Sequence, residues 1–317
     1  MIRKTAISLL SFFIFSGIKC QRVEMYFPEF KGKTYDFVIF QGSEQKTLVQ
    51  GTIPQDGKFV LIIPREYAPY TGMSRWLITG TKEGGGLDMY VPGHQFGVSC
   101  SSVKPNDSSI IYTGNSGNRE LSRLSRNQDK ILRRYEIMTE AIHIYTPEDH
   151  HYSVFLSERE TQKKDYNKFQ HLLEKRADYI SEFIRIVNIT KGIGTRLDDH
   201  QEETAENVET YITKNLNWEF LYTSGHWWNV ISGWVSIHTN VLKDRKRFAN
   251  HFETISLKLK SDHLYQDFVS RVVYFLKDGG NEAFLQAIIP SIKNSGRINN
   301  NPILLNEYLN ATGNPRI

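Results

Sequence analysis

Cysteine is the scarcest reactive residue in this chain, because its 317 residues contain only Cys20 and Cys100. No Cys-x-x-Cys pair is present, so the chain alone cannot cycle between a dithiol and a disulfide. Cys100 lies in HQFGVSCSS, where the alternation of apolar and polar residues predicts a strand. A lone cysteine on a strand is typical of a small buried apolar side chain and not of a nucleophile.

A strong net charge is also absent. The formal charge is +4, but Arg3, Lys4 and Lys19 supply three of these charges within the first twenty residues. Removal of that segment leaves a formal charge of about +1. A protein that binds nucleic acid is expected to keep a strongly basic face, so the sequence excludes a nucleic-acid partner.

No stretch is long and apolar enough to span a membrane. The run from Ala6 to Ile18 has about 13 residues, and a spanning helix needs about 20. It follows Arg3 and Lys4, which predicts a cleaved secretory signal peptide over residues 1–20 and export to the periplasm. The alternative is a lipoprotein signal in which Cys20 is lipidated, but Lys19 replaces the small residue expected before such a cysteine.

Local motifs for catalysis or metal binding are missing as well. The chain has no His-Glu-x-x-His pair, no Asp-rich calcium loop and no Gly-x-Ser-x-Gly elbow. Gly84-Gly85-Gly86 lacks the downstream residues of a phosphate loop and instead predicts a hairpin turn. From spacing alone we predict no catalytic residue, no metal ligand and no cofactor, and a hydrolase that uses His226 or His238 has no supporting motif.

The first part of the chain, residues 21–115, has a local period of two and frequent turn residues, which indicates short strands. About seven such segments predict an antiparallel β-sandwich-like domain, with a half-barrel as the alternative. Asp56-Gly57 is the clearest turn signal, because this pair supplies the positive φ of a tight hairpin. We therefore expect Leu48 to Ile53 to pair antiparallel with Lys58 to Ile63.

The second part, residues 116–296, has a period of about 3.6 and predicts an all-helical domain, which makes the fold class α+β. Apolar residues predict a long helix from Leu121 to Ile142 and a second from Phe155 to Leu173, joined as an antiparallel hairpin. Asp198 or Asp199 is expected to cap a later helix. Residues 297–317 are rich in asparagine and resemble a linker-like tail.

Four of the five tryptophans lie between Asn217 and Asp244. On a helix, an apolar stripe that includes Trp227, Trp234 and His238 faces one side and requires a covering layer of helices. His238 is either a polar group in an aromatic cleft or, as we favour, a core histidine bonded to a backbone carbonyl. The candidate ligand or partner face comprises His226, Trp227, Trp228 and His238, although packing between helices explains the aromatic residues equally well.

Several segments together resemble a known family: TIPQDGKFVLIIP, MSRWLITGTKEGGGLDM, NITKGIG and LYTSGHWWNVISGWVSIHT. They are similar to the N-terminal half of TlpA-like thiol-disulfide oxidoreductases of the bacterial periplasm, a group that includes proteins named as alkyl hydroperoxide reductases. In that family a small β-domain and a helical region precede a thioredoxin domain that carries Cys-x-x-Cys. The resemblance implies location, architecture and a thioredoxin-like partner, but no active-site residue transfers because the cysteine pair is missing.

Two functions follow as expectations. The first is a non-catalytic module of the cell envelope that positions or recognises partners for a thiol-disulfide oxidoreductase system. The second is an envelope protein that binds a small ligand or a glycan in an aromatic cleft on residues 226–242.

Overall fold

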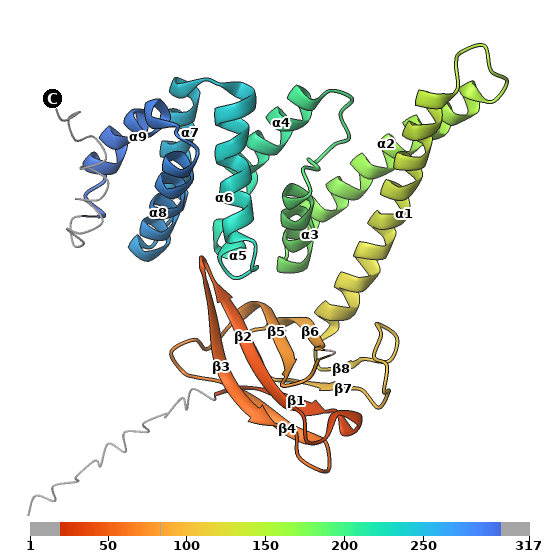
Figure 1. The fold of residues 1–317 in the computed structure, drawn as a ribbon, viewed down its shortest axis with the longest axis vertical. Helices are drawn as coiled ribbons and strands as arrows, with labels where there is room; N and C mark the ends of the chain where they lie inside the picture. Colours follow the sequence, from red (N-terminus) through yellow and green to blue (C-terminus); the bar gives the residue numbers. More distant parts are fainter. Residues whose placement is uncertain (1–19, 83, 299–317) are drawn as a thin grey trace, which may run out of the picture.

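The computed structural model describes residues 20–82 and 84–298. It has an α+β fold in which two four-stranded sheets are followed by a helical region, as predicted (Figure 1). The predicted signal peptide lies outside the described residues except for Cys20, and so does the predicted tail beyond residue 298. None of the described helices combines the length and the apolar character that crossing a membrane requires.

The sandwich consists of one sheet in the order β4-β1-β7-β8 and a second in the order β3-β2-β5-β6. The predicted antiparallel sandwich contains one parallel pair, because β1 pairs antiparallel with β4 but parallel with β7. The strands are β1 (Gln21–Tyr26), β2 (Thr34–Gln41), β3 (Glu44–Thr52), β4 (Lys58–Ile63), β5 (Thr71–Thr79), β6 (Gly86–Pro92), β7 (Phe96–Ser99) and β8 (Ile111–Thr113), with a short 3-10 turn η1 (Pro28–Phe30).

The predicted hairpin between β3 and β4 is wrong, although the turn itself is present. Gly57 has a φ of +72° and its N–H donates to the carbonyl of Pro54 at 2.9 Å. The turn carries the chain from one sheet to the other, since β3 pairs with β2 and β4 pairs with β1. Just after β3, the N–H of Ile53 still donates to the carbonyl of Lys33, and its side chain is 1% exposed. The chain therefore crosses to the other sheet after Ile53 has entered the sandwich core.

Side chains that alternate along the strands fill the space between the sheets. Strand β1, for example, alternates between buried and exposed residues at every position, as expected for one face on a core and the other in solvent. Each fully buried large apolar side chain contributes about 1.5–3 kcal/mol relative to exposure. The residues that are 0% exposed in this core are Val23, Phe37, Ile39, Leu61, Ile63, Met89 and Val91.

The helical region begins with the predicted antiparallel hairpin of α1 (Ser116–Ile144) and α2 (Tyr152–Arg176), which extends away from the sandwich (Figure 1). The side chain of Asn115 accepts a hydrogen bond from the N–H of Gly117 and caps α1. The remaining elements are α3 (Tyr179–Thr190), α4 (Gln201–Thr210), η2 (Tyr211–Asn215), α5 (Trp218–Tyr222), α6 (Trp227–Ser236), η3 (Ile237–Leu242), α7 (Arg245–Lys258), α8 (Asp262–Asp278) and α9 (Glu282–Asn294).

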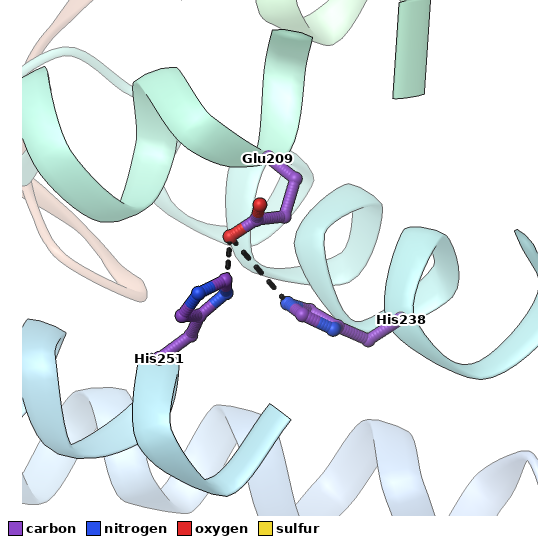
Figure 2. Close-up of side chains that lie close together, drawn as sticks. All are labelled: Glu209, His238 and His251. Carbon is purple, nitrogen blue, oxygen red and sulfur yellow. Dashed lines mark ion pairs between the residues drawn. The ribbon is translucent and has the colours of Figure 1, made fainter. Parts of the chain in front are cut away.

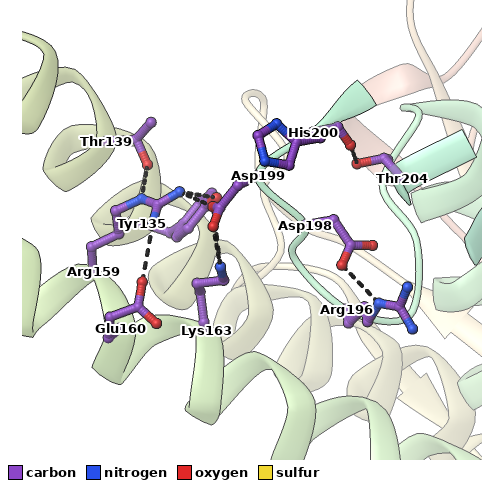
Figure 3. A network of polar contacts seen from close by, with 10 residues as sticks. All are labelled: Tyr135, Thr139, Arg159, Glu160, Lys163, Arg196, Asp198, Asp199, His200 and Thr204. Atoms are coloured by element: carbon purple, nitrogen blue, oxygen red, sulfur yellow. Dashed lines mark hydrogen bonds and ion pairs between the residues drawn. The ribbon is translucent and has the colours of Figure 1, made fainter. Parts of the chain in front are cut away.

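The expectation that Asp198 or Asp199 caps α4 is wrong. The helix begins after His200, which makes no side-chain cap, and both aspartates form ion pairs instead (Figure 3). Asp199 pairs with Arg159 and with Lys163, whereas Asp198 pairs with Arg196. A buried guanidinium requires a counter-charge, and Arg159 is only 7% exposed. This requirement outweighs the capping preference of Asp199.

The sandwich and the helical region are packed against each other. Phe40 and Met73 of the second sheet belong to one buried apolar cluster with Leu124, Phe169 and Tyr179 of the helices. At the turn between β2 and β3, the N–H and hydroxyl of Ser43 donate to the carboxylate of Asp267 at 2.9 and 2.6 Å. The two parts therefore share apolar and polar contacts and are not joined by the chain alone.

Candidate functional site

The apolar side predicted for the tryptophan stretch is buried, as expected, and the helix that carries it continues without a break from Trp227 to Leu242. The whole stretch folds as α5, α6 and the π-helical segment η3, with a break at Gly225, whose φ is +80°. Trp227, Trp234 and His238 are each 0% exposed, and helices α7 and α8 cover Trp234 through Phe248 and Phe268.

The four residues of the predicted ligand or partner face do not lie together on the surface. Trp227 packs against Trp218 and Tyr222 in the core, with ring centroids 5.6 and 5.5 Å apart. Trp228, the next residue, is 39% exposed and packs edge-to-face against Phe275, with ring centroids 4.8 Å apart. Because Trp227 and His238 are inaccessible, neither lines an open cleft in this structure.

His226 lies in a third environment. Its ring is 5.6 Å from that of Phe183, and burial lowers the pKa of His226 below its usual value, so the neutral form is favoured. Its Nδ1 atom has no hydrogen-bond partner within the described part of the chain. Of the four candidates, Trp228 alone presents a large aromatic surface to solvent.

A polar cluster that sequence spacing did not reveal includes His238, whose ring lies 5.0 Å from that of Trp234. It consists of Glu209 at the end of α4, His238 in η3 and His251 in α7 (Figure 2). Oε1 of Glu209 is 2.5 Å from Nδ1 of His251 and 3.7 Å from Nε2 of His238. All three ligand-type atoms lie within 4.8 Å of one another, which concentrates two imidazoles and a carboxylate in one small volume.

Two π-helical segments adjoin this cluster. Glu209 lies two residues before the first residue of η2, and His238 is the second residue of η3. A π-helical turn widens the helix and changes the direction in which the following side chains project, and such turns occur frequently at functional sites. The local irregularity in two separate helices therefore lies beside two of the three side chains, Glu209 and His238.

The carboxylate of Glu209 is 0% exposed and is also held by two further side chains. The hydroxyl of Thr213 donates to Oε1 at 2.6 Å and itself accepts a hydrogen bond from the indole of Trp234 at 3.3 Å. Arg247 donates to Oε2 at 3.0 Å. Burial raises the pKa of Glu209, but interactions with His238, Thr213 and His251 outweigh that effect and lower it to about 2. The side chain is therefore a fixed, ionised carboxylate.

The ring nitrogens of His238 and His251 have fewer hydrogen-bond partners than the carboxylate of Glu209. Neither Nδ1 nor Nε2 of His238 has a hydrogen-bond partner among the described residues, and neither does Nδ1 of His251, despite its short contact to Glu209. The favoured prediction for His238 is thus right about burial but wrong about a bond to a backbone carbonyl. An unsatisfied buried polar group costs about 1–3 kcal/mol, so His238 requires another explanation.

The sequence contained one signal for this cluster. His238 is a polar residue on an otherwise apolar stripe, but Glu209 and His251 belong to different helices and share no spacing motif with it. Comparison with known proteins found no matching family model, no similar curated protein and no similar solved structure. The roles of these residues must therefore be inferred from their own geometry and chemistry.

Proposed function

We propose that this protein is a non-catalytic module of the cell envelope that recognises or positions a thioredoxin-like partner. The resemblance to TlpA-like proteins motivates the proposal, and the fold is compatible with it, since a small β-domain precedes a helical region. The single observation that carries it concerns sulfur: Cys100 is 1% exposed and no second thiol is paired with it.

The environment of Cys100 supports a structural role. Its Sγ atom lies 3.6 Å from the hydroxyl of Ser109, and the residue belongs to the apolar core of the sandwich. A thiolate must be accessible to attack a disulfide, and a buried thiol in apolar surroundings is inert. The protein would then contribute surface to a redox system while its partner supplies the reactive cysteines.

Two measurements test the proposal together. In an insulin-reduction assay with dithiothreitol as the electron source, we expect the purified protein to give no turnover above the uncatalysed rate. In a binding titration, we expect it to associate with a thioredoxin-like domain of the same cell envelope whose two active-site cysteines are replaced by serine. Catalytic turnover, or absence of binding to every such domain, would overturn the proposal.

A second candidate function rests on the exposed aromatic surface at Trp228. Its ring lies 5.2 Å from that of Tyr274, which is 47% exposed, and the guanidinium of Arg271 lies 5.0 Å over the indole. Exposed aromatic faces of this kind can stack on small ligands or sugar rings. We expect an oligosaccharide that binds there to change the fluorescence of the protein but not that of Trp228→Ala, whereas Trp227→Phe, in the core, should retain the response.

A further inference from the structure

We propose that Glu209, His238 and His251 bind one divalent transition-metal ion, with zinc the best match. This inference is independent of the function proposed above. It rests on a ligand set of two imidazole nitrogens and one carboxylate oxygen, which is common to mononuclear sites for zinc and related first-row metals. The three side chains come from α4, η3 and α7, so one ion would join three elements.

The geometry requires only a small adjustment. Zinc binds imidazole nitrogen and carboxylate oxygen at about 2.0–2.2 Å, which places two ligands of a tetrahedral site about 3.5 Å apart. The distance from Oε1 of Glu209 to Nε2 of His238 is 3.7 Å, close to that value. The contact to Nδ1 of His251 is shorter, at 2.5 Å, and a movement of about 1 Å by this half-buried ring would open the position that the ion needs.

The unpartnered nitrogens are the second, independent observation. His238 is 0% exposed, and its Nε2 is directed at the carboxylate without forming a hydrogen bond (Figure 2). A metal ion accepts the lone pair of a neutral imidazole and removes the cost of leaving that nitrogen unsatisfied. The same ion would separate Nδ1 of His251 from Glu209, whose present contact does not have hydrogen-bond geometry.

The surrounding charges favour a dication. Arg247 is shared between Oε2 of Glu209 and Oε1 of Glu206, at 3.0 and 3.2 Å. The two carboxylates and one guanidinium therefore sum to one negative charge beside two imidazoles. Thr213 and Arg247 would act as outer partners that fix the carboxylate, as is usual for the ligands of metal sites.

The ligand type also discriminates between metals. Magnesium and calcium prefer six or more oxygen ligands, and neither is expected to bind two imidazoles in a buried site. Glu209 and His238 are closed to solvent, and only His251 has partial access, with 19% of its side chain exposed. We therefore assign the ion a structural role, in which it fastens α4, η3 and α7 to one another.

The test uses the full chain without a histidine tag, stripped with a chelator and titrated with zinc sulfate in a calorimeter. We expect a stoichiometry of one and a higher midpoint of thermal unfolding, whereas magnesium chloride should change neither. Titration with cobalt chloride should produce the intense visible absorption of a four-coordinate site, in which a water molecule completes the three protein ligands. Absence of stoichiometric zinc binding would overturn the proposal.

Substitutions then locate the site. His251→Ala should weaken zinc binding at least about 100-fold, since loss of an outer partner alone costs about 10–100-fold. His171→Ala is the matched control, because this histidine is on the surface of α2 with 62% of its side chain exposed. His238→Gln tests the buried ligand, and if it does not fold, the partly exposed His251 still decides the question. Unchanged zinc affinity in His251→Ala would contradict the assignment.

Discussion

The interior of the sandwich and the interior of the helical region differ in what they bury. Among the described residues, the buried charged side chains are Arg159, Glu182 and Glu209, and all three lie between helices. Within the sandwich, the buried polar side chains are those of Gln21 and Ser74, which are uncharged. Gln21 is fully paired, since it donates to the carbonyl of Tyr70 and accepts from its N–H.

This difference shows two ways to fix a fold. In the sandwich, the backbone ladders define which strands are neighbours, so the core can consist almost entirely of apolar side chains. Helices satisfy their own backbone groups and leave their neighbours less determined, so specific side-chain contacts can select one arrangement. Glu182 illustrates this, because it accepts from the hydroxyl of Tyr211 and from the N–H of Asn217 and so joins α3 to the segments around α5.

The largest expected effects test whether the two interiors are equally dependent on apolar packing. Phe37→Ala in β2 and Phe268→Ala in α8 each remove a ring that is 0% exposed, and each should lower the free energy of unfolding by about 3–5 kcal/mol. Urea titrations followed by circular dichroism and by tryptophan fluorescence measure this loss. Because Phe40 and Met73 join the sandwich to the helices, the two probes should report one transition. Two separate transitions would show that the shared contacts do not couple the parts.

Effects of intermediate size are expected when a buried polar side chain is removed from each interior, and the loss in the free energy of unfolding should be larger in the helical region. Glu182→Ala leaves the buried hydroxyl of Tyr211 without its acceptor and should cost about 2–3 kcal/mol. Ser74→Ala removes one neutral hydrogen bond to the carbonyl of Met89 and should cost about 1 kcal/mol. Chemical denaturation of both variants gives the comparison. Equal losses would mean that buried charge has no special role in the helical region.

The positions of most strands and helices along the sequence could be predicted because the signals for them are local. The apolar seam of α1 follows directly from the spacing of its apolar residues. The partner of β4 could not be predicted, because Asp56-Gly57 encodes a turn but not the identity of the strand that follows it in space. That choice depends on β1, which is separated from β4 by β2 and β3 in the sequence.

The candidate site was predictable only in part for the same reason. His238 was marked by its place on an apolar stripe, whereas Glu209 and His251 carry no local signal. The three meet only after α4, η3 and α7 have packed. Asp199 shows the opposite case, in which a local signal is present but misleading. Its preference for capping a helix is outweighed by the ion pair with Arg159, a buried cation on another helix.

The smallest expected effect concerns pH and a charged contact at the edge of the helical region. Hydrogen bonding by Arg123, with a further contribution from Arg176, outweighs burial and lowers the pKa of Glu120 to about 2. A carboxyl whose pKa is lower in the folded state stabilises that state above its unfolded value of 4.5, and this stabilisation is lost as the pH falls from 4.5 towards 2.

Because the side chain of Glu120 is 25% exposed, solvent screening should limit the effect to about 1 kcal/mol or less. We expect Glu120→Gln to lower the urea midpoint at pH 7 but to have little effect at pH 2.5, where the wild-type carboxyl is itself largely protonated in the unfolded chain and partly so in the folded one. Glu24→Gln, on the exposed side of β1, should be neutral at both values. A pH-independent loss in Glu120→Gln would mean that the glutamate acts through packing. The contrast between a helical interior with charged side chains and a sandwich interior without them would then rest on the buried groups alone.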